Sequence, residues 1–372
     1  MRRSVFPFLL FLLVTVSLSA QDSSYARRII AGLSDVSVWG RGYSYRGDSI
    51  AAEFIRSEFQ KLGVEPLGDN YFQNYELDVY GFEGDCELSI NGNQLVPYEE
   101  FRVVPTYSAK RRMEAAWSKT FNGVTFVGVE KLSTMVPIAG GKSSVPFSVE
   151  VLQSALPHKV KKLQYNIPLR HFPHYQTQNV CGIVRGESDS MLVYTAHYDH
   201  CGTMGDKVLF PGAHDNASGV AAVLDVARMA TLKKPHYTMV FLLFSGEETG
   251  LCGSLYAAEH PLIDFSKVRL LTNIDMFCGG DEGFMVVNAN DAATDPWVKS
   301  MEAKASQMEH PVVVKRRNNA ANSDHYWFSQ LCPAIFVYTL GGPYGGYHDP
   351  ADTCEGCGLG NYHSILSLIA NW

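Results

Sequence analysis

The 372-residue chain is 46% hydrophobic and 19% charged. These are the proportions of an ordinary globular protein that buries a large core as one big domain or two smaller ones. Its net charge of −7 makes it a poor partner for nucleic acid, whose phosphates require a basic face. The simplest consequence of the acidic balance is solubility.

The N-terminus has the pattern of a targeting segment. Two arginines precede an apolar run from Val5 to Val16, and small residues follow it. This order predicts a signal peptide over residues 1–20, cleaved near Ser19 or Ala20, after which the net charge becomes −9. An uncleaved membrane anchor is the alternative, but the run is short for a bilayer span and lacks a cysteine for lipid attachment. We therefore predict an exported protein, periplasmic or extracellular, with no stable membrane anchor.

The first part of the mature chain predicts a loop, a helix and then strands. Residues 21–48 are polar and rich in Gly and Tyr, which predicts a lead-in loop. Ser49–Leu62 carries an apolar stripe at helical spacing, with Gly63 as its stop. Aromatic and β-branched residues predict strands at Tyr71–Tyr80 and Cys86–Ile90, and Asn91-Gly92-Asn93 is a hairpin signal.

Residues from about Pro97 to Tyr175 carry no chemical motif. They are rich in Val, Phe, Ser and Lys, and their apolar content is too high for a mobile linker. We predict a β-rich elaboration at about 97–175, forming a lid or rim, inserted into a single domain that spans residues 21–372.

The remainder alternates apolar runs with helical patterns. Continuous apolar runs of this kind predict an α/β fold with a mostly parallel sheet buried on both faces. Helices are predicted after Asp215, at 295–308 and at 362–370. The predicted strands are Asn179–Arg185, Met191–Ala196, Tyr237–Phe244, Val268–Ile274, Phe284–Val287, Val312–Val314 and Ala334–Leu340.

Metal-binding residue types follow three of these strands. His197-Tyr198-Asp199, Glu247-Glu248 and Asp275 each come directly after an apolar run or one turn beyond it. In an open α/β sheet, sites form outside the carboxyl ends of the strands. Asp215 lies among small residues where a loop enters a helix, so it can approach closely and bridge two metals. His348 lies in a glycine-rich loop that can fold back over this edge.

At these residues the chain resembles the M28 family of zinc aminopeptidases, in particular the secreted bacterial di-zinc leucine aminopeptidases. The motifs that carry the resemblance are HYD at 197–199, GAHDNASG at 212–219, GEETGLCGS at 246–254, NID at 273–275, SDH at 323–325 and YHDPADT at 347–353. They follow the family's order across residues 179–372, and 49–77 also resembles the family's N-terminal part. The resemblance implies a three-layer αβα sandwich of the zinc-peptidase type.

The resemblance also implies a role for each motif residue. One zinc would be held by His197, Asp215 and Asp275, and a second by Asp215, Glu248 and His348, so that Asp215 bridges two zincs per chain. Glu247 would be the general base and acid, and Asp199 would orient His197. The implied reaction is hydrolysis of N-terminal residues from peptides by a metal-activated water.

Other residues near the motifs are open to simpler readings. Asp324 and His325 resemble a wall of the substrate pocket, although a helix-start cap is equally expected. Tyr344 and Tyr347 either line that pocket or pack within their loop. His200 and His214, which neighbour the expected ligands, are read as supporting or exposed residues.

The eight cysteines all lie outside the predicted signal peptide. Export permits disulfides, and Cys354 and Cys357 form the closest pair in sequence. A zinc knuckle would need a second such pair, which the chain lacks, so a short-loop disulfide between these two is predicted, with free thiols as the alternative.

Several functions remain open at this point. A glutaminyl cyclase on the same architecture would use one zinc, and a dipeptidase or carboxypeptidase would need a basic group such as Arg316 or Arg317 near the pocket. A non-catalytic binding module is a further alternative, against which the intact Glu247 argues. The sequence names neither the preferred N-terminal residue nor the oligomeric state, and its ligand types would also accept cobalt or manganese.

Overall fold

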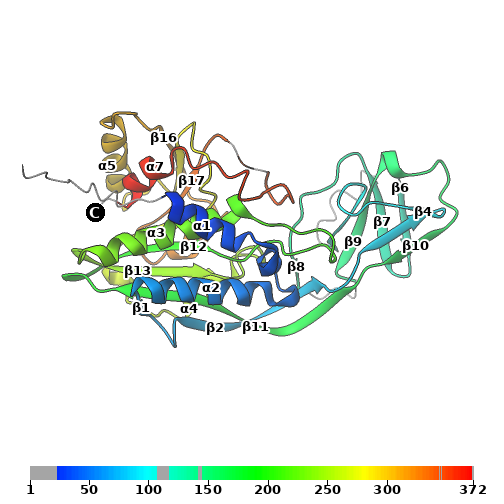
Figure 1. Ribbon diagram of the computed structural model, residues 1–372, viewed down its shortest axis with the longest axis horizontal. Coiled ribbons are helices and arrows are strands. Elements are labelled where there is room, and N and C mark those ends of the chain that lie inside the picture. The colour runs from blue at the N-terminus through cyan, green and yellow to red at the C-terminus, as the bar shows by residue number, and fades with distance from the viewer. Residues whose placement is uncertain (1–22, 107–116, 141–144, 343, 345, 371–372) are drawn as a thin grey trace, which may run out of the picture.

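A computed structural model describes residues 23–106, 117–140, 145–342, 344 and 346–370. The body of the molecule is a ten-stranded mixed sheet between two layers of helices, and a second, β-rich lobe projects from one end (Figure 1). The predicted α/β sandwich with a β-rich elaboration is therefore confirmed. The predicted signal peptide lies outside the described residues. Among those residues, no helix is both long enough and apolar enough to cross a bilayer.

The four central strands of the large sheet are parallel, and the strands that flank them, β15 and β11, are antiparallel to them, while the edge strand β16 is parallel to β15. The strand order is β16-β15-β17-β14-β12-β13-β11-β2-β8, and the short β1 pairs with β11. β12 is parallel to both β13 and β14, and β14 is parallel to β17. The bounds are β1 Glu65–Pro66, β2 Phe72–Phe82, β8 Ile138–Ala139, β11 Leu169–Val184, β12 Ser188–His197, β13 Tyr237–Phe244, β14 Val268–Ile274, β15 Phe284–Val287, β16 Val314–Arg317 and β17 Ala334–Thr339.

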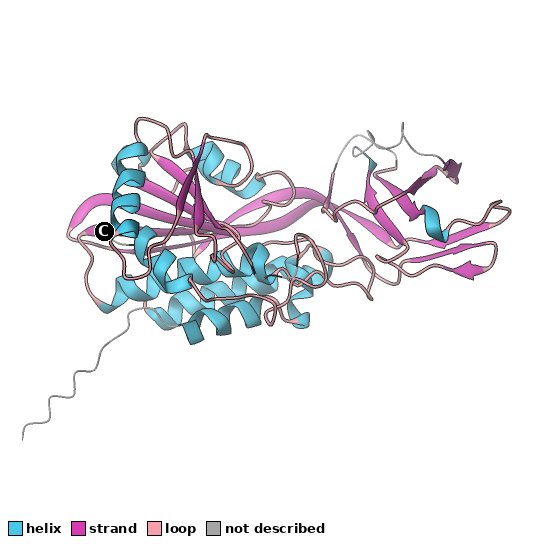
Figure 2. Cartoon of the chain, turned by 90° about the horizontal axis from the view of Figure 1, so that it is seen from above, coloured by secondary structure: helices cyan, strands magenta, loops and turns pink. Residues whose placement is uncertain are grey.

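Helices cover both faces of this sheet, as Figure 2 shows for the larger group. α3 contacts β12, β13 and β14 directly, and its first ten residues are all buried, which is why that stretch is small and apolar. α1, α2, α3, α5 and α7 share one hydrophobic core, whereas α4 and α6 pack on the opposite face. Their bounds are α1 Ser23–Leu33, α2 Gly47–Leu62, α3 Ser218–Leu232, α4 Cys252–Glu259, α5 Asp295–Ser306, α6 His325–Phe328 and α7 Tyr362–Ile369.

The lead-in loop predicted for residues 21–48 is wrong. Ala26, Ile29, Ile30 and Leu33 are fully buried and lie on one face of α1. This spacing of three and four residues is an amphipathic helix that packs on α3. Only the part after Leu33 is irregular, in two short 3₁₀ segments, η1 Val36–Arg41 and η2 Ser44–Arg46.

The β-rich lobe contains two small sheets, with strand orders β10-β3-β4 and β5-β9-β7-β6. Its hydrophobic core begins at Phe82, upstream of the expected boundary at Pro97, and β2 and β11 run from the body toward it (Figure 1). The hairpin signal is confirmed, because Asn91 and Gly92 both have positive φ between the paired β3 and β4. The bounds are β3 Glu87–Ile90, β4 Asn93–Gln94, β5 Phe101–Pro105, β6 Trp117–Phe121, β7 Val124–Val129, β9 Phe147–Leu152 and β10 Leu163–Asn166, with η4 at Gln153–Ala155.

Two further expectations need correction. Cys357 forms its disulfide with Cys278, 79 positions away in sequence, and Cys354 is a free thiol. Proximity along the chain was misleading because the segment after Asp275 and the C-terminal loop meet at the same end of the sheet. The strand predicted at Val312–Val314 begins only at Val314, where pairing with β15 starts.

Candidate metal centre

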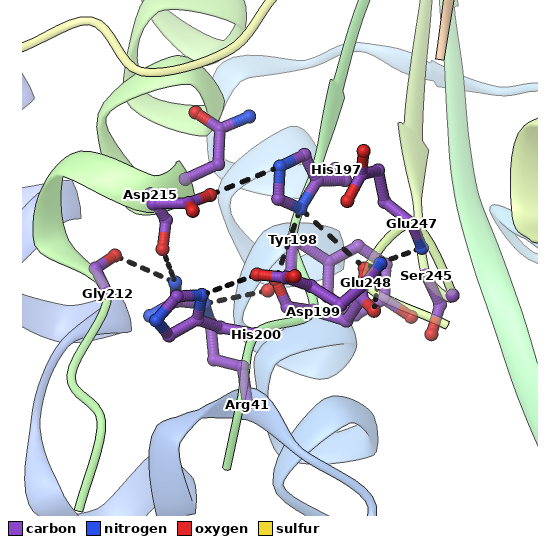
Figure 3. Close-up of polar contacts among 12 residues, drawn as sticks. Arg41, His197, Tyr198, Asp199, His200, Gly212, Asp215, Ser245, Glu247 and Glu248 are labelled. Atoms are coloured by element: carbon purple, nitrogen blue, oxygen red, sulfur yellow. Dashed lines mark hydrogen bonds and ion pairs between the residues drawn. The ribbon is translucent and has the colours of Figure 1, made fainter. Parts of the chain in front are cut away.

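The strand ends bring the predicted ligands together. His197 is the last residue of β12 and lies beside Phe244, the last residue of β13. Asp275 directly follows β14, on the other side of β12. Since parallel strands end at one edge of a sheet, residues far apart in sequence converge there. Figure 3 shows His197, Asp215, Glu247 and Glu248 facing one another at this edge.

The first cluster consists of His197, Asp215 and Asp275, all buried. The Nε2 atom of His197 lies 3.4 Å from Asp215 Oδ1 and 3.2 Å from Asp275 Oδ1. Burial would lower the pKa of His197, but the carboxylates, Asp275 foremost, raise that pKa well above its usual value. One nitrogen and two carboxylate oxygens thus point at one small volume.

The second cluster shares Asp215 with the first. The Nε2 atom of His348 lies 3.1 Å from Asp215 Oδ2 and 3.0 Å from Glu248 Oε1. Although burial opposes ionisation, His348 lowers the pKa of Glu248 to about 2. Because the two oxygens of Asp215 face different histidines, its carboxylate joins the two clusters in the manner of a bridging ligand.

Asp199 organises the turn that carries the two glutamates. Its carboxylate accepts hydrogen bonds from the backbone N–H groups of Glu247, at 3.1 Å, and Glu248, at 3.3 Å. His197 Nδ1 lies 3.2 Å from the Asp199 carbonyl oxygen and 3.7 Å from its carboxylate, so the same residue orients the histidine. The carboxylate also accepts a hydrogen bond from the hydroxyl of Tyr43.

The electrostatics of Glu247 differ from those of Asp215 and Glu248, whose pKa values, despite burial, are lowered by the neighbouring histidines. Burial first, and then the negative charges of Glu248, Asp324 and Asp275, raise the pKa of Glu247 well above its usual value in the metal-free chain. The side chains of these two adjacent glutamates diverge, so Glu248 belongs to the second cluster and Glu247 lies outside both clusters. A carboxyl with a raised pKa beside a metal site is suited to taking and returning a proton.

Arg41 supports the centre and was missed by sequence reasoning. It is fully buried, and its five N–H donors point to five backbone carbonyl groups, those of Leu33, Tyr198, Pro211, Gly212 and Asp215. One side chain therefore joins α1 to the loop after His197 and to the loop that carries Asp215, as Figure 3 shows in part. The available signal was the pair of flanking glycines, since a Cβ at Gly40 would lie 2.3 Å from the Gly202 carbonyl oxygen.

The loop before α3 is held from two sides. Gly212 has φ 61°, and a Cβ there would lie 2.5 Å from the Arg41 guanidinium, so only glycine fits. Asp352 is fully buried and accepts hydrogen bonds from the backbone N–H groups of His214 and Asp215. The YHDPADT motif thus places His348 and also orders the loop that carries Asp215, the residue that the two clusters share.

The SDH motif supports the first cluster through its serine. Ser323 Oγ donates a 2.7 Å hydrogen bond to Asp275 Oδ2 and accepts one from Asn273. Asp324 is buried, and burial raises its pKa to about 7, while His325 lies in α6 with its ring 5.4 Å from that of Phe336. Contact of Asp324 and His325 with a substrate stays a prediction.

The remaining candidates surround the second cluster. Tyr347 stacks on His348 and Tyr344 on His214, and both tyrosines are about half exposed at the rim of the centre. His200 and His214 are both buried. His200 Nδ1 lies 2.8 Å from Glu248 Oε1 and so helps to hold that carboxylate in place.

The basic residues considered for a carboxylate pocket lie elsewhere. Arg316 is on the edge strand β16 and is bound by Glu302 and Asp295 of α5. Glu302 and Asp295 both lie outside the two clusters, so Arg316 holds α5 against the edge of the sheet.

The donor set fits a pair of zinc ions. Each cluster offers imidazole nitrogen and carboxylate oxygen, the ligand types that zinc takes in catalytic sites, and the shared Asp215 matches a bridged pair. Without a cation, three buried carboxylates converge on two imidazoles, an arrangement whose negative charge a metal would offset. The fold and the site together define a hydrolase of the zinc-peptidase type.

The chain belongs to peptidase family M28, whose family model matches residues 179–372. A curated relative, the aminopeptidase YwaD of Bacillus subtilis, is 28% identical over 176 residues, which cover 46% of this chain and 36% of the relative. The alignments to the curated relatives cover between 17% and 36% of those relatives' lengths. The expected family is therefore confirmed.

Solved structures confirm the fold over nearly the whole chain. The zinc aminopeptidase BSAP of Bacillus subtilis has a TM-score of 0.66 at 19% identity, with 94% of this chain and 93% of that one covered. A glutaminyl cyclase of Bacteroides thetaiotaomicron has a TM-score of 0.57 at 13% identity, covering 94% and 96%. Since both activities occur on this fold, the site must decide between them.

Proposed function

We propose that the protein is a two-zinc aminopeptidase that removes N-terminal residues from peptides. The observation that carries the proposal is the bridging placement of Asp215, whose two carboxylate oxygens lie 3.4 Å from His197 Nε2 and 3.1 Å from His348 Nε2. A single-metal site has no need for a carboxylate shared between two histidine-containing clusters. Family membership and the similarity to YwaD support the same activity.

His197, Asp215 and Asp275 would hold one zinc, and Asp215, Glu248 and His348 the other. Bound zinc would lower the pKa of a coordinated water and polarise the scissile carbonyl. Glu247 would take the proton of the attacking water and deliver it to the leaving amine, for which its raised pKa equips it. Asp199 keeps Glu247 and Glu248 on one turn through their backbone N–H groups.

The acidic surroundings of the site also suit a free N-terminus. A substrate amine is a cation, and the carboxylates that converge on the centre would attract it. A carboxypeptidase would need a basic residue to bind the carboxylate of its substrate. Arg316 does not supply it, because its guanidinium is paired with Asp295 and Glu302 of α5. We further propose that the protein acts after export, in line with its N-terminal pattern and with the Cys278–Cys357 disulfide, which an oxidising compartment would maintain.

The test is a panel of aminoacyl-nitroanilides with free and with acetylated amines, together with zinc content per chain. The proposal expects about two zincs per chain and turnover of the free-amine substrates alone. One zinc per chain with cyclisation of N-terminal glutamine would instead identify a glutaminyl cyclase. A fully loaded protein that is inert on every free-amine substrate would exclude the aminopeptidase, and dipeptides and blocked peptides would be assayed next.

A further inference from the structure

The loop of residues 131–137, between β7 and β8 in the β-rich lobe, reaches the metal centre. The main-chain carbonyl of Met135 lies 2.5 Å from Nδ1 of His348. A carbonyl oxygen only accepts hydrogen bonds, so Nδ1 carries a proton and donates it to Met135, and Nε2, the nitrogen that faces Asp215 and Glu248, is the one left for a metal. Hydrogen bonds of this kind orient metal-binding histidines and set their tautomer.

The Met135 carbonyl is held rigidly by the lobe. The Met135 side chain is 1% exposed and belongs to the lobe's hydrophobic core. Two positions earlier, Ser133 donates 2.6 Å hydrogen bonds from its N–H and its hydroxyl to the buried carboxylate of Glu150 on β9. Arg102 on β5, directly opposite Glu150 in the sheet, donates to the Ser133 carbonyl. The loop is thus fastened to two strands.

A second connection joins the lobe to the same segment. The hydroxyl of Tyr98 donates to the carboxylate of Asp349, the residue after His348. The Tyr98 ring is held under the guanidinium of Arg102, at 3.9 Å, and against Phe210. Asp349 in turn accepts from the backbone N–H of Ala351 and orders the turn that ends in Asp352. Both connections therefore lead to residues that shape the second cluster.

His348 needs this support because its own loop does not provide it. Its φ of 52° is in the left-handed region, which a residue with a Cβ keeps only when its surroundings hold it there. The first cluster has no such dependence: Asp199, Ser323 and the strand ends of the body hold His197 and Asp275.

We propose that the β-rich lobe is part of the metal site, with Met135, Ser133, Glu150 and Tyr98 as positioning residues that raise the affinity of the second zinc position. The inference rests on the proposed two-zinc function. It assigns to the inserted lobe a role at the metal, in place of the lid or rim expected from its sequence.

The test is zinc titration of the metal-free full-length protein against a chromophoric chelator, for wild type, Tyr98→Phe and Glu150→Gln. Tyr98→Phe keeps the ring under Arg102, and Glu150→Gln keeps the shape while replacing one acceptor with a donor. We expect the second dissociation constant to rise by about tenfold or more in each variant, with the first unchanged. Excess zinc should restore kcat, which a role confined to folding would not predict.

Glu100→Gln is the matched control, because Glu100 is a lobe carboxylate that accepts a hydrogen bond from Val96 N–H and contacts neither cluster. It should titrate like wild type. The inference would be overturned if Tyr98→Phe bound both zincs as tightly as wild type does, or if both variants bound the two zincs more weakly by the same factor. Either result would leave the two-zinc function intact. A wild-type protein that takes up one zinc would instead refute the two-zinc function itself.

Discussion

The two halves of the metal centre share Asp215 but are built from different parts of the molecule. The half around His197 and Asp275 lies on the ends of β12 and β14 and is held by Asp199 and Ser323. The half around Glu248 and His348 lies partly on a loop and contacts His200 and the β-rich lobe. Strand ends are positioned by a whole sheet, whereas a loop ligand must be positioned by its neighbours, so the two halves should respond differently to substitution.

Glu247 belongs to neither half, so its substitution separates chemistry from metal binding. Glu247→Gln removes the proton acceptor and should lower kcat by about 10²–10⁴-fold. Both zinc affinities should stay close to wild type, because Glu247 is not in either cluster. Aminoacyl-nitroanilide kinetics and zinc content measure the two effects, with the exposed Glu309→Gln as the control. Loss of zinc in Glu247→Gln would show that this residue is a ligand.

The Cys278–Cys357 disulfide joins the segment that follows Asp275 to the segment that follows His348. Removing it with Cys278→Ser should lower the free energy of unfolding by about 2–4 kcal/mol, because the unfolded chain regains the freedom of a long loop. Denaturant unfolding of the metal-free protein measures this loss, and Cys357→Ser should behave in the same way. Cys332→Ser, which replaces a free thiol, is the control. Unchanged stability in both single variants would refute the bond.

Asp48 belongs to neither cluster, so its substitution tests whether the stability of the fold can change without a change in metal binding. Its carboxylate accepts from Tyr175 and from Thr177, which also bonds to Ser245 at the end of β13. Burial, against the hydrogen bonds from Tyr175 and Thr177, raises the pKa of Asp48 from 3.8 to about 6. The folded state therefore binds this proton more tightly than the unfolded chain does, and stability is lost as pH rises from about 4 through about 6.

Asp48→Asn should lack that loss. The altered hydrogen bond shifts the stability of the metal-free variant by the same amount at every pH. Beyond that shift, the unfolding free energy of the variant relative to wild type should rise by up to about 3 kcal/mol between pH 4 and pH 7. Denaturant unfolding at both pH values tests this, and zinc affinities at pH 7 should not change. An equal pH dependence in the two proteins would mean that Asp48 is ionised in the fold as readily as in the unfolded chain.

Ser323→Ala tests the half around His197 and Asp275 in the same way that Tyr98→Phe and Glu150→Gln test the half around His348. It removes the 2.7 Å hydrogen bond to Asp275 Oδ2. We expect the first zinc to bind about tenfold more weakly, at the mild end of the range for such supporting contacts, and the second zinc to be unaffected. Ser266→Ala, which removes a hydroxyl that donates to the exposed Asp264, is the control. If Ser323→Ala and Tyr98→Phe weakened the same zinc, the division of the centre into two halves would be wrong.

The expectations from sequence succeeded where the signal was local. The strands Tyr237–Phe244 and Val268–Ile274 were predicted with the bounds that the structure has, because their apolar runs end sharply at polar residues. The helix ending at Leu62 was also predicted correctly, since Gly63 has φ 74° and closes it. The same reasoning failed at residues 21–48, where the polar and Gly-rich second half of the stretch hid the four buried positions of α1.

The order of the motifs along the chain was enough to predict which side chains gather at one edge of the sheet, and their positions in the sheet explain why. His197, Glu248 and Asp275 each follow an apolar strand, and parallel strands must end at one edge. The convergence of these residues, the α/β fold and the family were therefore determined by the sequence itself.

Only the tertiary structure decided what holds the ligands in place. Arg41 and Asp352 bind backbone atoms of distant loops, and Met135 binds His348 through its own backbone carbonyl. Hydrogen bonds that involve backbone atoms leave no pattern in the sequence. The Cys278–Cys357 pairing was hidden for a related reason, because it depends on how two segments meet beyond the sheet. Side-chain periodicity reports which face is buried, whereas hydrogen bonds to distant carbonyl and N–H groups exist only once the chain has folded.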